Sequence, residues 1–196
     1  MRIRRRTACP QFTATTGRYD TVAARLAAPD MSDAYGLRTM SSQSGGFGPL
    51  RYHCGAVWPH DTAIAVAGLA RTGHPEAAAR LIEGILDAAP AFDYRLPELW
   101  GGDARTDTPA PVPYSAACRP RAWSAASAIA LMTALTGLDP DVLASRLHLR
   151  PTGLLSVGAL TVAGERLDIA IASEGRIESV SAPSGLIVEE HAASRS

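Results

Sequence analysis

The sequence contains no lysine, so all 19 of its basic residues are arginine, and 19 acidic residues balance them. The formal net charge at pH 7 is zero, which leaves no overall positive field to attract nucleic acid or an anionic membrane surface. In a chain this rich in alanine, arginine without lysine is typical of a bias in the coding sequence rather than of a phosphate-binding device. We therefore expect neither nucleic acid nor a membrane as a partner.

Cysteine is scarce as well. Cys9, Cys54 and Cys118 are an odd number of thiols, and no two of them form a CxxC pair. This pattern disfavours a zinc site and a disulfide framework, and it favours a reducing compartment such as the cytoplasm. No apolar run reaches the roughly 20 residues that span a bilayer, and the arginine-rich start lacks the apolar segment of a signal peptide. The sequence predicts a cytoplasmic protein without a metal or another cofactor.

The rest of the composition is that of a folded protein. Hydrophobic residues make up 46% of the chain and charged residues 19%, values that separate it from disordered proteins. A chain of 196 residues is enough for one ordinary domain with a small appendage. We divide it into an irregular N-terminus at 1–19, a helical domain at 20–150, and a C-terminal segment of β-strands with a tail at 151–196.

Proline and glycine mark where the main helices begin and end. One helix is predicted from Pro59 to Gly73 and another from Pro120 to Gly137. Both are apolar on nearly all faces, which predicts that both are buried on all sides. A third helix begins at Pro75 and has one apolar face and one charged face, a pattern that is typical of an outer helix.

Two shorter helices and several strands complete the prediction. One short helix spans 20–28, with Asp20 as its N-cap and Pro29 as its stop, and the other begins at Asp139. The apolar side of the second comprises Val142, Leu143 and Leu147. After residue 151, short segments that are rich in strand-forming residues predict one small antiparallel sheet. Its strands are predicted at 160–162, 167–171, 177–180 and 186–189.

Long loops lie at 31–50 and 93–119, before the two helices that are predicted to be buried. Loops of about 20 residues are unusual inside a compact domain unless they carry function. Buried helices that alternate with outer ones, with long loops leading into the buried ones, are typical of an α/α toroid, whose inner helices line a funnel. We predict a mainly α fold of this kind, followed by the small C-terminal antiparallel β segment.

Two short segments combine aromatic, histidine and carboxylate side chains, one from Tyr52 to Asp61 and one from Arg95 to Gly102. Cleavage of a glycosidic bond needs two carboxylates, one to protonate the leaving oxygen and one to activate water, and aromatic rings hold the sugar. We predict that Glu98 is catalytic, because a charged residue between apolar neighbours indicates a pocket, and Arg95 could either orient it or hold its pKa low. The predicted sugar-binding residues are Tyr52, His53, Trp58, His60, Asp61, Arg95 and Trp100.

Several of these residues also have a purely structural interpretation. Trp58 could fill the core at the start of a helix, and Asp61 could stabilise the positive end of the helix dipole. His53 and His60 could bind a metal ion, but no third and fourth ligands occur at a usual spacing. Cys54 could act as a nucleophile, but nothing near it in the sequence would activate it.

Several segments that follow one another along the chain resemble a known family. They are Gly36 to Thr39, Tyr52 to Asp61, Arg95 to Leu99, Pro111 to Tyr114, Ala117 with Cys118, and Ala122 with Trp123. Over residues 20–170 they resemble the C-terminal third of bacterial amylo-alpha-1,6-glucosidases, the glycogen debranching enzyme-like proteins. Those proteins belong with the six-hairpin glycosidases, whose relatives include mannosylglycerate hydrolase, trehalase and glucoamylase.

The resemblance implies a partial (α/α)6 toroid and inverting hydrolysis of a glucosidic bond in an oligo- or polysaccharide. It also implies that Glu98 is the general base and that the general acid is an aspartate of an earlier hairpin. Because the predicted helices are too few for a whole toroid, we expect a fragment that lacks this acid and whose open edge another chain could cover. One alternative is a non-catalytic carbohydrate-binding or interaction remnant of the same fold, and another is a helical regulatory domain in which these loops only pack.

Overall fold

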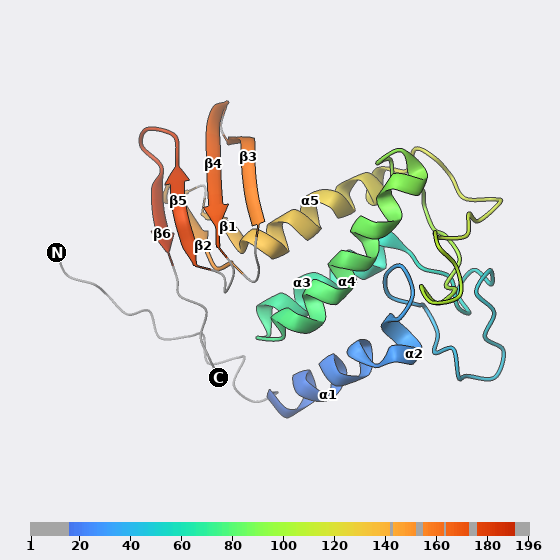
Figure 1. The fold of residues 1–196 in the computed structure, drawn as a ribbon. Coiled ribbons are helices and arrows are strands. Elements are labelled where there is room, and N and C mark those ends of the chain that lie inside the picture. The colour runs from blue at the N-terminus through green and yellow to red at the C-terminus, as the bar shows by residue number, and fades with distance from the viewer. Residues whose placement is uncertain (1–15, 142, 152–154, 163, 173–175, 191–196) are drawn as a thin grey trace.

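The computed structural model describes residues 16–141, 143–151, 155–162, 164–172 and 176–190. Its first part is helical and its last part consists of strands, with α5 leading from one to the other (Figure 1). The helices are α1 (Thr16–Ala27), α2 (Pro29–Ser32), α3 (Pro59–Arg71), α4 (Pro75–Ala88), the 3-10 turn η2 (Ala89–Phe92) and α5 (Ala122–Thr136). The strands are β1 (Leu138–Asp141), β2 (Arg146–Leu149), β3 (Leu155–Val162), β4 (Glu165–Ile171), β5 (Ile177–Ser181) and β6 (Ile187–Glu190).

Helix α1 begins earlier than the sequence pattern predicts. It starts at Thr16, so Asp20 lies in its second turn and is not its N-cap. The Asp20 carboxylate instead lies 3.0 Å from Nε2 of His74, the residue that precedes α4. Helix α1 ends at Ala27, just before Pro29, as predicted, and the separate short helix α2 begins at Pro29, because a proline loses no hydrogen bond at the first helical position. Residues 1–15, predicted to be irregular, lie outside the described residues.

The two apolar helices begin and end close to where they are predicted. Helix α3 begins at Pro59, and α5 is followed by Gly137 in a left-handed conformation with φ of 60°. A Cβ atom on Gly137 would lie 1.9 Å from the carbonyl oxygen of Arg150, so only glycine fits this turn. The prediction that α3 and α5 are buried on all sides, however, is wrong. Ile64 of α3 is 61% exposed and Ile129 of α5 is 64% exposed, because α3 packs against α4 and α5 and α5 packs against α3, which leaves part of each helix surface uncovered by the other described helices.

Helix α4 has the predicted apolar stripe, buried at Ala78, Leu81, Ile82 and Ile85. Leu86, predicted as part of the stripe, lies at its edge and is 58% exposed. Gly84 lets the loop before α3 cross this helix closely, since a Cβ atom on Gly84 would lie 2.7 Å from the backbone nitrogen of Gly36. The loop is thereby held on the same helix that supports α3.

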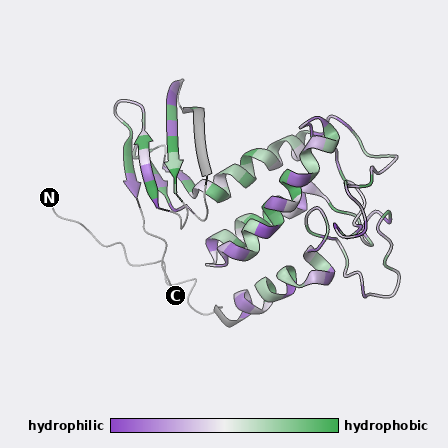
Figure 2. Ribbon diagram, viewed as in Figure 1, coloured by the Kyte–Doolittle hydropathy of each residue, from purple (hydrophilic) through white to green (hydrophobic). Residues whose placement is uncertain are grey.

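The helices pack in the order α1, α4, α3, α5 (Figure 1). Figure 2 shows hydrophobic residues along most of α5, whereas α4 carries both hydrophilic and hydrophobic residues. In the described part of the chain these helices form an open row, and a toroid is not confirmed. A helical part followed by strands is as predicted, but the strands begin at Leu138 and not after residue 151. None of the described helices is long and apolar enough to cross a membrane.

The prediction of a short helix that begins at Asp139 is wrong. The residues there form β1, which pairs antiparallel with β2. Leu147 and Leu149 are buried at alternate positions of β2, while Leu143 is fully exposed between the strands and Val142 lies outside the described residues. The segment is too short to be stable as a helix by itself, and the period-two alternation of a strand buries both of these leucines.

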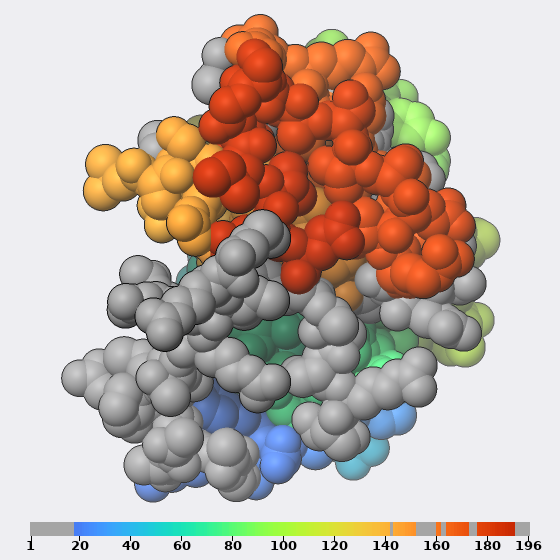
Figure 3. Space-filling view, turned by 90° about the vertical axis from the view of Figure 1, so that its left-hand side faces the viewer, coloured from blue at the N-terminus to red at the C-terminus, as the bar shows by residue number. Residues whose placement is uncertain are grey.

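The strands form two three-stranded sheets rather than one. β3, β4 and β5 form an antiparallel sheet, as predicted, whereas β2 also pairs in parallel with β6, so the sheet β1-β2-β6 is mixed. Every second side chain of β4 is buried, which confirms the alternation predicted at 167–171. The buried residues of this part are Leu147, Leu149, Leu167, Ile169 and Ile171. In Figure 3 most of the strands, in orange and red, lie toward the top of the molecule and α1, in blue, lies at the bottom.

Candidate functional site

Two segments with chemistry-bearing side chains lie next to each other in a short ladder. Val57 donates its N–H to the carbonyl oxygen of Trp100 at 2.9 Å, and Trp100 returns the bond at 3.1 Å. Arg38 bridges to the other side of Val57, and Pro113 to the other side of Trp100. The ladder therefore brings the segment from Tyr52 to Asp61 against the segment that holds Glu98.

Neighbouring side chains of this ladder point to opposite sides. Val57 and Trp100 belong to the core among the helices. Trp58 and Leu99 instead belong to a second cluster, against which Tyr114 packs. Because side chains alternate along an extended segment, the ladder separates the helical core from an outer layer that contains the aromatic residues.

Four aromatic side chains form what we call the aromatic wall: Tyr52, His53, Trp58 and Tyr114. The Tyr52 ring lies edge-on to Trp58 at 4.7 Å between centroids and 6.1 Å from Tyr114, and the rings of His53 and Trp58 stack at 5.4 Å. Trp58 is nearly buried and donates its indole N–H to the Tyr52 carbonyl oxygen at 3.1 Å. Trp58 is thus the buried member of the aromatic wall, while Tyr52 and His53 face solvent.

Glu98 is buried, with only 5% of its surface exposed. Its Oε1 lies 3.0 Å from Nη2 of Arg121, and its Oε2 accepts a hydrogen bond from the backbone N–H of Cys118 at 3.3 Å. The backbone N–H of Glu98 also donates to the Cys118 carbonyl oxygen at 3.0 Å. A buried carboxylate is tolerated when it is paired and hydrogen-bonded, and both oxygens meet that condition here.

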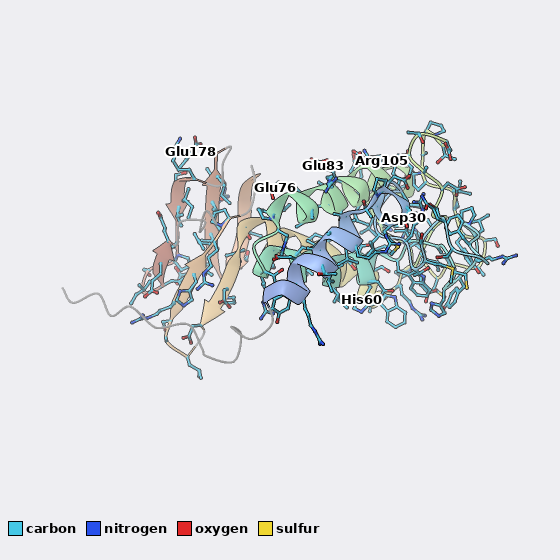
Figure 4. All side chains as sticks on the ribbon, turned by 90° about the horizontal axis from the view of Figure 1, so that it is seen from below. Asp30, His60, Glu76, Glu83, Arg105 and Glu178 are labelled. Carbon is cyan, nitrogen blue, oxygen red and sulfur yellow. The ribbon has the colours of Figure 1, made fainter. Side chains whose placement is uncertain are left out.

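Arg121 is held by an aromatic stack. Its guanidinium lies 4.2 Å from the centroid of the Trp123 ring, and Trp123 stacks on His60 with 6.1 Å between centroids and 24° between planes. We call Arg121, Trp123 and His60 the arginine stack. It links the start of α5 to the start of α3, where Figure 4 shows His60 at the boundary between the helices and the loops.

The remaining predicted site residues lie elsewhere. Trp100 is fully buried, its ring stacks on Phe92 at 5.3 Å, and its indole N–H has no hydrogen-bond partner among the described residues. Arg95 is exposed and makes no ion pair with Glu98, whose cation is Arg121. Asp61 is exposed in the first turn of α3, a position that also suits a dipole-stabilising charge.

The sequence reading missed Arg121, Tyr114 and Trp123 as site residues. Tyr114 and Trp123 stand in segments that carry the family resemblance, and an arginine directly before a helix is the only local signal for Arg121. Nothing in the sequence pairs Arg121 with Glu98, since the two are far apart along the chain. In the part of the chain that the structure describes, no three potential metal ligands cluster.

A pocket of about 260 Å³ lies beside the aromatic wall. It is lined by Ala91, Phe92, Pro97, Leu99, Pro113, Tyr114, Ala117 and Arg119. Glu98 does not line it although both of its neighbours do, because adjacent side chains of an extended segment point to opposite sides. The carboxylate is therefore directed away from this pocket and toward the arginine stack.

A buried arginine ties the loops of the site together. Arg38 is 3% exposed, and it donates to the carbonyl oxygens of Gly102 at 2.6 Å, Asp30 at 3.2 Å and Pro29 at 3.3 Å. It also forms an ion pair with Asp33. One guanidinium thereby joins the α2 region to the loop that follows Trp100.

Asp30 is the most strongly perturbed acid in the described structure. The Arg25 guanidinium binds it through two nitrogens, at 2.9 Å and 2.6 Å, and the Ser41 hydroxyl also donates to it. These donors favour the ionised form and lower the pKa of Asp30 from 3.8 to about 2. The effect is structural, since Asp30 holds the loop at 41–44 onto α2.

Comparison with known proteins places part of the chain near a glycosidase family. Residues 10–93 match the family model described as the Mannosylglycerate hydrolase MGH1-like glycoside hydrolase domain. The match includes Tyr52, His53 and Trp58 of the aromatic wall, and it ends before Glu98 and Arg121. No curated protein matches the chain. The match supports a glycosidase-type domain of the six-hairpin kind over these residues, and it gives no support to the finer amylo-alpha-1,6-glucosidase assignment.

Proposed function

We propose that the chain binds a carbohydrate along the aromatic wall and the arginine stack, and that Glu98 is the general base for inverting hydrolysis of a glycosidic bond. The observation that carries this proposal is the pair of hydrogen bonds between Val57 and Trp100. They set the Glu98 segment beside exposed aromatic side chains of a segment that is similar to a glycoside hydrolase domain.

Each side chain has a role that fits its exposure. Tyr52 and His53 face solvent and supply flat surfaces for the apolar faces of a sugar ring. His60 is half-buried and Asp61 is exposed at the same helix start, so both can bind hydroxyl groups. Arg95 offers further donors from the surface, and Trp100 supports the ladder from the core. Glu98 would accept the proton of the attacking water.

The finer assignment is also part of the proposal. A glucosidic bond of the amylo-alpha-1,6 type and a mannosylglycerate-type glycoside are the two substrate classes to compare, the second because of the name of the matched model. We further propose that the general acid is not one of the residues that the structure describes. The resemblance implies that it is an aspartate of an earlier hairpin. Another chain could supply it while covering the open edge of the helices.

The non-catalytic alternative has one specific observation in its favour. Both oxygens of Glu98 are already engaged, by Arg121 and by the Cys118 N–H, and the side chain is 5% exposed. A general base needs a lone pair within reach of water, whereas a binding protein needs only the walls of the site. On this alternative the chain binds a sugar and Glu98 is a structural charge.

The test of carbohydrate binding is a calorimetric titration with mannosylglycerate, maltose and a branched glucan oligosaccharide. Tyr52→Ala is expected to weaken binding by roughly three- to tenfold, because the exposed ring of the wall is lost. Tyr94→Ala is the matched control, since Tyr94 is 78% exposed and lies outside the wall. Equal loss of binding in both variants, or binding of none of the three sugars, would contradict the proposal.

A further inference from the structure

We propose that Arg121 is a positioning residue for Glu98, and that it acts from a place fixed by Trp123 and His60. The inference rests on the proposed role of Glu98 as a general base. It assigns to Arg121 a part in the site that the matched family segment does not cover, because residues 10–93 end well before Arg121.

The ion pair restricts how the Glu98 carboxylate can turn. Arg121 holds Oε1 at 3.0 Å, while the backbone N–H of Cys118 reaches Oε2 at 3.3 Å, a longer contact. The shorter contact also joins two opposite charges, so it is the stronger of the two. Without Arg121, the backbone donor alone would hold the side chain, and a buried carboxylate without its cation would be driven toward solvent.

The stack restricts Arg121 in turn. An arginine side chain has many rotamers and is ordered only where it gains contacts. Arg121 lies over the Trp123 ring at 4.2 Å, and Trp123 lies on His60, which belongs to the first turn of α3. The position of the guanidinium is thus set by two helices at once, and that position decides where Oε1 lies.

The geometry also explains why lysine cannot replace Arg121. The planar guanidinium can stack on an indole and donate to a carboxylate at the same time, whereas an ammonium group is a compact charge on a flexible chain. Arg119, two residues earlier, does not share these contacts. It pairs with Asp93 on the surface at 3.1 Å and is a matched arginine outside the arginine stack.

Carboxylate labelling measures the position of Glu98 without any substrate. The full chain is treated with a carbodiimide and an amine, and the labelling rate of Glu98 is followed by peptide mass spectrometry. Glu76 and Glu83, both exposed on α4 (Figure 4), are the internal references. Arg121→Gln is expected to raise the Glu98 rate by roughly tenfold over the references, because the cation that pairs with the buried carboxylate is lost.

The series of variants separates positioning from general loosening. Trp123→Leu keeps the positive charge of Arg121 but removes the aromatic ring on which Arg121 lies. Arg121→Lys keeps a positive charge but lacks the planar guanidinium. In both variants we expect Glu98 to be labelled at a rate between those of the wild type and Arg121→Gln. In Arg119→Gln, Glu98 is expected to be labelled at the wild-type rate. If Arg121→Gln does not stay folded at the labelling temperature, the other variants test the proposal. The proposal then requires that Glu98 is labelled faster in Arg121→Lys and in Trp123→Leu than in Arg119→Gln.

The proposal is overturned if Glu98 labels at the wild-type rate in Arg121→Gln, or if Arg119→Gln raises the rate as much. It is also overturned if Arg121→Lys behaves as the wild type does. These outcomes are independent of the sugar titration, which is run separately on the wild type. A chain that binds no sugar contradicts the proposed function, whereas unchanged labelling contradicts only the role of Arg121.

Discussion

Glu98 and Arg121 illustrate what single residues reveal. A glutamate between two apolar residues indicated a pocket, and Glu98 is buried but does not line the pocket beside the aromatic wall. The sequence, however, pointed to Arg95 as its cation because Arg95 is near in the chain. The fold exposes Arg95 and brings Arg121 to 3.0 Å from the carboxylate instead. Proximity along the chain is a poor guide to ion pairs that join a loop to a distant helix.

Acidification is expected to weaken the Asp30 contacts only well below neutral pH. Folding lowers the pKa of Asp30 from 3.8 to about 2, chiefly through Arg25 and then through Ser41. The contribution to stability is therefore complete above the unfolded value and is lost as the pH falls through the folded one. In a carboxyl titration by NMR, Arg25→Gln should raise the pKa of Asp30 more than Ser41→Ala does. A larger rise in Ser41→Ala would contradict this order.

Replacing Arg38 should destabilise the loops of the site. Arg38→Met leaves the carbonyl oxygens of Gly102 and Asp30 without their buried donor, and we expect a loss of about 3–5 kcal/mol in the free energy of unfolding. Urea denaturation followed by circular dichroism measures it. Arg51→Met is the control, because Arg51 is exposed although it also donates to a carbonyl oxygen, that of Gly46. A change of more than about 1 kcal/mol in the control would mean that exposure does not decide the effect.

At the scale of the elements, the start and end signals were better guides than the burial patterns. Pro59 and Pro75 begin α3 and α4, and Gly137 follows α5, as predicted. These signals rest on local backbone chemistry, so they survive in the fold. The apolar surfaces of α3 and α5 did not predict burial on every side, because burial depends on how many neighbours the fold supplies.

A glycine of α4 tests how closely the site loop crosses that helix. Gly84→Ala is expected to destabilise the protein by about 1–3 kcal/mol, because the new methyl group would lie 2.7 Å from the backbone nitrogen of Gly36. Gly68→Ala in α3 has no atom within 4 Å of the new methyl group and should stabilise the helix by roughly 0.5–1 kcal/mol. Thermal unfolding of both variants measures whether each substitution lowers or raises the stability of the protein. A stabilising Gly84→Ala would mean that the loop does not cross α4 so closely.

The hairpin of β1 and β2 shows where element prediction failed. Residues 139–147 hold one proline and two leucines, a composition that fits a short helix or a hairpin. The left-handed turn at Gly137 redirects the chain, and β6, from the far end of the sequence, pairs with β2. The strands at 138–149 therefore rest on the local pairing of β1 with β2 and on the distant strand β6, which covers the other edge of β2.

At the scale of the whole molecule, we expect the chain to bind sugar without cleaving it. Inverting hydrolysis needs a second carboxylate roughly 6.5–9.5 Å from the base, on the other side of the bond, and the resemblance assigns that role to an aspartate of an earlier hairpin. Release of reducing sugar from maltose, a branched glucan or mannosylglycerate should stay at background. Turnover that disappears in Glu98→Gln would show instead that the chain supplies both groups.

The amino-acid sequence determined the helix starts at Pro59 and Pro75, the period-two strand at 167–171 and the two segments that carry the candidate chemistry. Those features depend on backbone chemistry and on periodicity, which are local properties. Only the tertiary structure decided that Trp100 is core, that Arg121 pairs with Glu98 and that β2 joins β6. Each of these depends on which distant segments meet, because burial and ion pairing are properties of neighbours in space and not in sequence.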